Sequence, residues 1–69
     1  MQLSARNQLK GRVVSVAPGA SIANVEIEVG DQRLMASITV EAADELALNE
    51  GMDVIAVIKA SDVIVAVGD

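Results

Sequence analysis

Two short stretches near the ends of the chain carry the side chains best suited to binding an anion. Ser4-Ala5-Arg6 places a hydroxyl and a guanidinium within three residues, and Lys59-Ala60-Ser61 places an ammonium beside a second hydroxyl. Arginine and lysine supply full positive charges, while hydroxyls and backbone amides supply further donors to oxygen atoms. These residue types predict capture of a tetrahedral oxyanion, with each stretch giving half of the site.

Each of these side chains also has an ordinary structural role, and spacing alone leaves the alternatives open. Arg6 could form a surface or interface salt bridge, and Lys59 ends an apolar run, where a lysine commonly lays its stem over apolar surface. Ser4, Ser61 and Thr39 could be turn or cap hydroxyls. A structural β-oligomer, in which Arg6 and Lys59 only form interface salt bridges, is therefore one hypothesis.

Composition argues against several classes of function. The chain has no His and no Cys, which excludes Cys–His nucleophiles, His-based triads and His/Cys metal sites, and it has no P-loop or dinucleotide glycine motif. An enzyme is not expected. A net charge of −5 and the absence of aromatic residues argue against nucleic acid and against an anionic membrane. No signal sequence or spanning stretch is found, so the expected location is the cytoplasm.

The first half of the chain has the pattern of β-strands. β-Branched residues predict a strand from Leu9 to Val16. Pro18-Gly19 then predicts a tight type II turn in which Gly19 takes a positive φ. Strict alternation of apolar and polar residues from 24 to 29 predicts a strand with one acidic face in water.

The second half combines strands with one short helix. Gly30-Asp31 predicts a hairpin turn into a strand from Arg33 to Thr39, and Thr39 is the expected N-cap of a helix from Val40 to about Leu48. Residues 52–58 and 63–67 are almost continuously apolar, which predicts two strands covered on both faces. The whole chain, 1–69, is thus expected to be a single all-β domain with one short helix, a five-stranded Greek-key barrel of the OB type.

Assembly is expected on physical grounds. Sixty-nine residues without aromatic side chains or cysteines can bury little surface alone, and the usual staples of small domains are missing. The remaining way to bury enough apolar surface is against other copies of the same chain.

Three stretches together resemble the molbindin, or Mop, family of small molybdate-binding domains, also called TOBE-type domains. These stretches are Ser4 to Gly11, Ala36 to Thr39 and Ala56 to Val63. The resemblance spans essentially the whole chain. It implies an OB-like barrel, pairing of subunits by exchange of a β-strand, and a homohexamer built as a trimer of dimers, with molybdate or tungstate bound between subunits.

The site implied by this resemblance combines hydroxyls, amides and two cations from neighbouring chains. Its members are Ser4, Ala5 (through its amide) and Arg6 of one chain, and Lys59, Ala60 and Ser61 of another. Thr39 would complete the shell from a chain that the sequence does not identify. The family also has a second type of site near its three-fold axis, for which the turn residues Gly19, Ala20 and Ser21 are the candidates.

The resemblance predicts a protein that holds molybdate through hydrogen bonds, without a cofactor and without direct coordination of a metal. A single domain with no attached DNA-binding or ATPase part favours storage and buffering of the anion. The alternative hypothesis is an anion-sensing oligomerisation module that regulates a transporter or a transcription partner.

Overall fold

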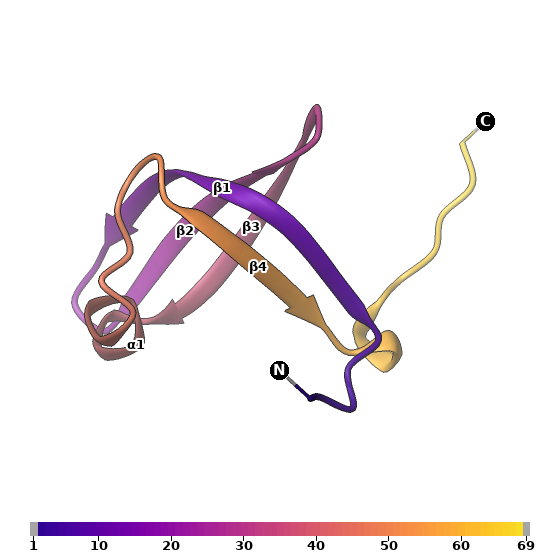
Figure 1. Cartoon of the computed structure of the whole chain (residues 1–69), viewed down its shortest axis with the longest axis horizontal. Helices are drawn as coiled ribbons and strands as arrows, with labels where there is room; N and C mark the ends of the chain where they lie inside the picture. Colours follow the sequence, from indigo (N-terminus) through magenta and orange to yellow (C-terminus); the bar gives the residue numbers. More distant parts are fainter. Residues whose placement is uncertain (1, 69) are drawn as a thin grey trace.

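The chain forms one antiparallel sheet with a short helix at its side. The computed structural model describes residues 2–68 (Figure 1). Its elements, in chain order, are β1 (Asn7–Pro18), β2 (Ile22–Val29), β3 (Gln32–Thr39), α1 (Val40–Glu45), β4 (Asp53–Ile58) and the 3₁₀ helix η1 (Ala60–Asp62). The strand order in the sheet is β3-β2-β1-β4. The expected all-β class with one short helix is confirmed.

Strand β1 is long and bent, and it pairs with two neighbours in turn. Its first half, Asn7 to Arg12, pairs with β4, while Arg12 to Pro18 pairs with β2. The register with β2 shifts between Val13 and Ser15, and such a bulge bends a strand. At Gly11 a Cβ atom would lie 2.7 Å from the carbonyl oxygen of Glu28, so only glycine fits where β1 crosses β2 this closely. The bend lets one strand join both halves of the sheet.

The core is small and consists of aliphatic side chains. Val13, Val25, Ile27 and Ala56 form one buried cluster, which brings together β1, β2 and β4. No aromatic residue contributes, so the apolar area buried by a single chain is limited. Because side chains alternate between the two faces of a strand, the buried residues determine which residues of β1 and β4 face outward.

Local turn and cap chemistry matches the sequence in two places. The two-residue turn between β2 and β3 has Gly30 at φ 61°, as a hairpin of this length requires. The Thr39 hydroxyl accepts a hydrogen bond from the Ala42 amide at 3.0 Å, which confirms it as the N-cap of α1. The helix ends at Glu45, earlier than expected, and Ala47 follows with φ 51°, a left-handed conformation that cannot continue a helix.

The expected type II turn at Gly19 is wrong. Strand β1 continues to Pro18, which still pairs with Ala23. Gly19 is not among the glycines with positive φ; instead its amide donates to the Ile22 carbonyl at 2.7 Å. The turn is therefore closed by this hydrogen bond, and the left-handed conformation of glycine is not used.

The fifth strand expected over residues 63–67 pairs with none of the strands in residues 2–68. This C-terminal segment extends away from the body (Figure 1) and ends with Ile64, Val65 and Val67 between 84% and 93% exposed. In β4, Ile55 and Val57 are 49% and 42% exposed, so the expected cover on both faces is absent from the single chain. The sheet of one chain has four strands, with β3 and β4 as free edges.

An apolar groove of about 310 Å³ lies beside these free edges. Side chains from β2, β3 and β4 line it, among them Val25, Leu34, Ile38, Val54 and Ile58. A barrel closes only when its edge strands are joined, and the groove occupies the open side. Within the described chain, neither helix is long and apolar enough to cross a membrane.

Candidate functional site

The two stretches predicted to bind an anion emerge side by side at one end of the β1–β4 pair. The register pairs Asn7 with Ile58, so the residues just before Asn7 and just after Ile58 leave the sheet at the same edge (Figure 1). We call this group the strand-end site; its members are Ser4, Ala5, Arg6, Lys59, Ala60 and Ser61. One chain brings all six into the same region.

The register also predicts which side chains share a face. Gln8 pairs with Val57 and Lys10 with Ile55, and continuing this alternation by one pair places Arg6 opposite Lys59. Both residues are exposed in the single chain. Sequence reasoning assigned them to different chains, but in one chain Arg6 directly precedes β1 and Lys59 directly follows β4, next to the paired residues Asn7 and Ile58.

Arg6 and Lys59 are not engaged by carboxylates of their own chain. Of the five basic residues, Arg33 pairs with Glu26 at 2.7 Å and with Glu28 at 3.9 Å, and Arg12 pairs with Asp53 at 3.9 Å. Over residues 2–68, Arg6, Lys10 and Lys59 form no ion pair. Two of these three cations belong to the strand-end site, which leaves it positive in an otherwise acidic protein.

The neutral donors of the strand-end site are also unengaged. The hydroxyls of Ser4 and Ser61 have no hydrogen-bond partner within the described part of the chain. The first backbone bond of η1 runs from the Asp62 amide to the Lys59 carbonyl at 2.9 Å. The amides of Ala60 and Ser61 come before it, as the unsatisfied first amides of any helical turn. The site therefore combines two cations with several donors that the fold does not use.

Thr39 lies at another part of the molecule, beside the residues predicted for a second site. Thr39 pairs with Ile22 across the sheet, and the Val40 amide donates to the Ser21 carbonyl at 2.9 Å. We call this group the turn site; its members are Gly19, Ala20, Ser21 and Thr39. In Figure 1 it lies next to α1, across the molecule from η1. Within one chain, Thr39 therefore cannot complete the strand-end site.

The turn site has little capacity to hold an anion by itself. It contains no cation, and Glu41 of α1 lies two residues after Thr39. The Thr39 hydroxyl already accepts the capping bond from Ala42, although its own proton is free to be donated.

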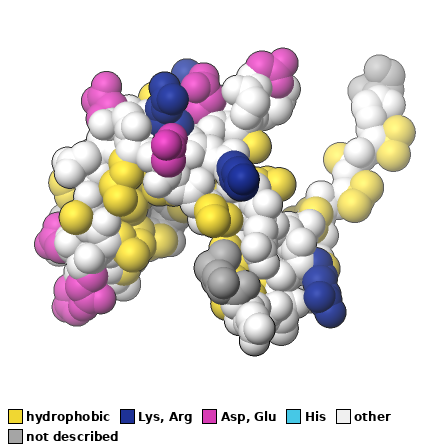
Figure 2. Space-filling model, in the orientation of Figure 1, with side chains coloured by type: hydrophobic (Ala, Val, Ile, Leu, Met, Phe, Trp, Pro, Cys, Tyr) yellow, Lys and Arg dark blue, Asp and Glu magenta, His cyan; other side chains and the backbone are white. Residues whose placement is uncertain are grey.

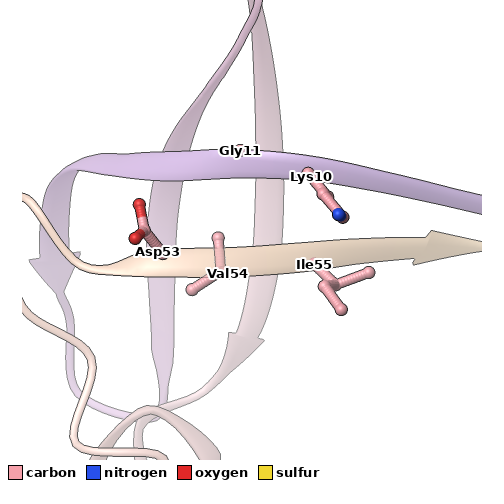
Figure 3. A pocket seen from close by; sticks show the side chains of 5 residues that line it. All are labelled: Lys10, Gly11, Asp53, Val54 and Ile55. Carbon is pink, nitrogen blue, oxygen red and sulfur yellow. The ribbon is translucent and has the colours of Figure 1, made fainter. Parts of the chain in front are cut away.

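Sequence reasoning did not include Lys10 among the candidate ligands, although this residue too forms no ion pair over residues 2–68. This residue lines a shallow hollow of about 620 Å³ on the outer surface of β1 and β4, together with Gly11, Asp53, Val54 and Ile55 (Figure 3). The signal was present in the alternation of Gln8 and Lys10 in β1, which places both on the same face as Arg6. Within residues 2–68, no cluster of three or more His, Cys, Asp or Glu is arranged to ligate a metal ion.

Known proteins match almost the whole chain. The family model of the TOBE domain matches residues 3–65. A probable molybdenum-pterin-binding protein of Haemophilus influenzae is 44% identical over 68 residues, covering 97% of this chain and 99% of that protein. Molybdenum-pterin-binding protein 1 of Clostridium pasteurianum is 41% identical over 66 residues, covering 94% and 97%.

A solved structure agrees with these sequence matches. The molybdate-binding protein from Sporomusa ovata superimposes with a TM-score of 0.93 at 30% identity, covering 96% of this chain and 98% of the other. The likeness therefore extends over the four strands, α1 and η1.

Proposed function

Because the chain belongs to the TOBE domain family, we propose that it binds molybdate, or tungstate, at the strand-end site and stores and buffers the anion in the cytoplasm without changing it chemically. Relatives of nearly the same length are named for binding molybdenum-pterin, and a structural relative for binding molybdate. The observation that carries the proposal is the pair of unengaged cations, Arg6 and Lys59, at one end of the β1–β4 pair.

The chemistry of the site suits a dianion without protons. One arginine and one lysine match two negative charges, and hydroxyls and amides fill the remaining lone pairs of the oxygens. At neutral pH, phosphate carries a proton that needs an acceptor, and the site offers mainly donors, so phosphate is expected to bind more weakly than molybdate. Sulfate carries no proton, so its rejection rests on its smaller size.

The site lies between chains in this proposal. Arg6 and Lys59 are exposed in the single chain, where water weakens each interaction with an anion. A second chain packed over this corner excludes water and faces the Arg6 of one chain toward the Lys59 of the other. Thr39 reaches the same anion only from another chain, since its own strand-end site is across the molecule.

Exchange of the C-terminal segment accounts for the assembly. Residues 63–67 form an exposed apolar segment, seen as yellow atoms standing away from the body in Figure 2. The apolar groove between β3 and β4 offers a matching surface on a second chain. Insertion there joins the free edges and buries Ile64, Val65 and Val67. The proposed assembly is a homohexamer, a trimer of such dimers.

Calorimetric titration with molybdate, tungstate, sulfate and phosphate tests the proposal. We expect saturable binding of the first two anions. Arg6→Ala and Lys59→Ala each weaken it by at least about 100-fold, because each leaves charge on the buried anion uncompensated. Arg12→Ala is the matched control, since Arg12 already pairs with Asp53 on the same strand pair. Equal affinity of wild type, Arg6→Ala and Lys59→Ala would remove this site from consideration.

Two further measurements separate the alternatives. Elemental analysis of the purified protein is expected to find molybdenum, and its absence together with no titration favours the purely structural oligomer. A partner captured from cell extract only in the presence, or only in the absence, of molybdate favours sensing over storage.

A further inference from the structure

Half of the strand-end site is also the joint from which the C-terminal segment departs. Lys59, Ala60 and Ser61 lie between the end of β4 and the extended residues 63–68. Two backbone hydrogen bonds shape this joint: the Asp62 amide donates to the Lys59 carbonyl at 2.9 Å, and the Val63 amide donates to the Ala60 carbonyl at 3.2 Å. In Figure 1 the segment leaves the body at this turn. The direction of the segment therefore depends on residues that are also candidate anion ligands.

The other half of the site is fixed to the body of the sheet. Ser4, Ala5 and Arg6 lead directly into β1, whose first residue pairs with Ile58 at the end of β4. In the proposed assembly the two halves of a site come from two chains, so a bound anion connects the fixed sheet of one chain to the joint of the other. Few contacts restrain the joint otherwise: η1 is a three-residue turn with no buried residue and no side-chain cap.

We infer that anion binding at the strand-end site and exchange of the C-terminal segment between chains are coupled. The bound anion holds η1 in the direction that delivers residues 63–67 into the groove of a second chain. By thermodynamic reciprocity, assembly raises the affinity for the anion by the same factor. This inference rests on the proposed function, and it makes the buffer's affinity depend on the concentration of the protein itself.

Subunit exchange measures the coupling directly. Unlabelled and ¹⁵N-labelled oligomers are mixed, and native mass spectrometry follows the appearance of mixed oligomers, with saturating molybdate or with sulfate at the same ionic strength. Molybdate is expected to slow exchange by about 5- to 150-fold, the usual range of coupling between two binding events. The temperature is chosen so that exchange without molybdate takes minutes to hours.

The outcomes distinguish failure of the inference from failure of the proposed function. Calorimetric binding of molybdate with an unchanged exchange rate overturns the coupling and the placement of the site between chains, but leaves binding and storage of molybdate standing, with both cations on one chain. Absence of binding, or a protein that is monomeric at micromolar concentration, overturns both. Slower exchange with molybdate than with sulfate supports the coupling.

A matched pair of variants tests whether the joint carries the effect. Asp62→Gly and Asp62→Asn both remove the charge of an exposed residue in η1, but only glycine loosens the backbone. Without molybdate, the glycine variant is expected to exchange about 2- to 5-fold faster than the asparagine variant, and saturating molybdate brings the two rates together. Equal rates without molybdate show that η1 does not control exchange and overturn the role given to the joint. Thermal melting confirms that both variants are folded.

Discussion

The strand-end site and the turn site both lie where strands end, but they differ in which polar groups have a hydrogen-bond or ion-pair partner within the chain. At the turn site, the Gly19 amide, the Ser21 carbonyl and the Thr39 hydroxyl all have partners within the chain. At the strand-end site, Arg6 and Lys59 have none in residues 2–68. The Ser21 hydroxyl has no partner in the described residues either, so the two groups differ chiefly in charge: only the strand-end site has cations that a ligand or a second chain could engage.

The largest expected effect comes from mixing two variants, each of which lacks one cation of the strand-end site. Arg6→Ala and Lys59→Ala chains, each binding molybdate at least about 100-fold more weakly, are unfolded together in equal amounts and refolded. If each site takes Arg6 from one chain and Lys59 from another, about one quarter of the sites in random mixed oligomers are intact again. Calorimetry at low molybdate concentration counts these tight sites.

Mixing each variant only with itself is the control for that experiment, since neither homo-oligomer regains a complete site. A mixed sample with no tight sites means that both cations act from one chain. The register of Asn7 with Ile58 allows that geometry. The experiment therefore decides between two arrangements of the same six residues.

The sequence predicted those parts of the fold that depend on local chemistry. Gly30 with Asp31 specified the hairpin, and Thr39 specified the helix start, because each requirement involves only neighbouring residues. The turn at Gly19 was predicted wrongly because the Pro-Gly pair permits more than one turn. Pro18 pairs with Ala23, so the turn that forms is the one that lets β1 and β2 stay paired up to this position.

The sequence predicted which residues are candidates for the site, but not how the sheet of one chain arranges them. The Mop resemblance carried by Ser4 to Gly11 and by the C-terminal motif is confirmed by the TOBE match. That Arg6 and Lys59 flank the paired residues Asn7 and Ile58 of one chain depends on the register of two strands far apart in sequence. Whether residues 63–67 form a fifth strand depends on what packs against them. The sequence shows only that this segment is apolar, and in the single chain it is exposed.

Substitutions at Thr39 separate its helix cap from a role in anion binding. Thr39→Val removes the hydroxyl that accepts from Ala42 and is expected to cost about 1 kcal/mol of stability, or roughly 4–8 °C in Tm. Thr39→Asp keeps the cap but adds a negative charge, so it is expected to stay folded. If Thr39 of another chain donates to the anion, Thr39→Asp also loses molybdate affinity; if it serves only as a cap, affinity at the strand-end site is unchanged. Thr39→Ser is the control that preserves both functions.

The smallest expected effect comes from Asp62, the carboxylate next in sequence to the strand-end site. Asp62 follows Ser61 directly, so its charge repels a bound dianion at short range. Asp62→Asn is expected to tighten molybdate binding about two- to fivefold in calorimetry at about 0.15 M salt. Asp31→Asn, on the β2–β3 hairpin far from η1 (Figure 1), removes the same charge and should change little, since salt screens charges beyond roughly 8–10 Å. A similar gain from both variants, or a steep rise of wild-type affinity with inert salt, would mean that the acidic remainder of the protein opposes binding. Either result would contradict the view that the donors of the strand-end site determine the affinity for molybdate.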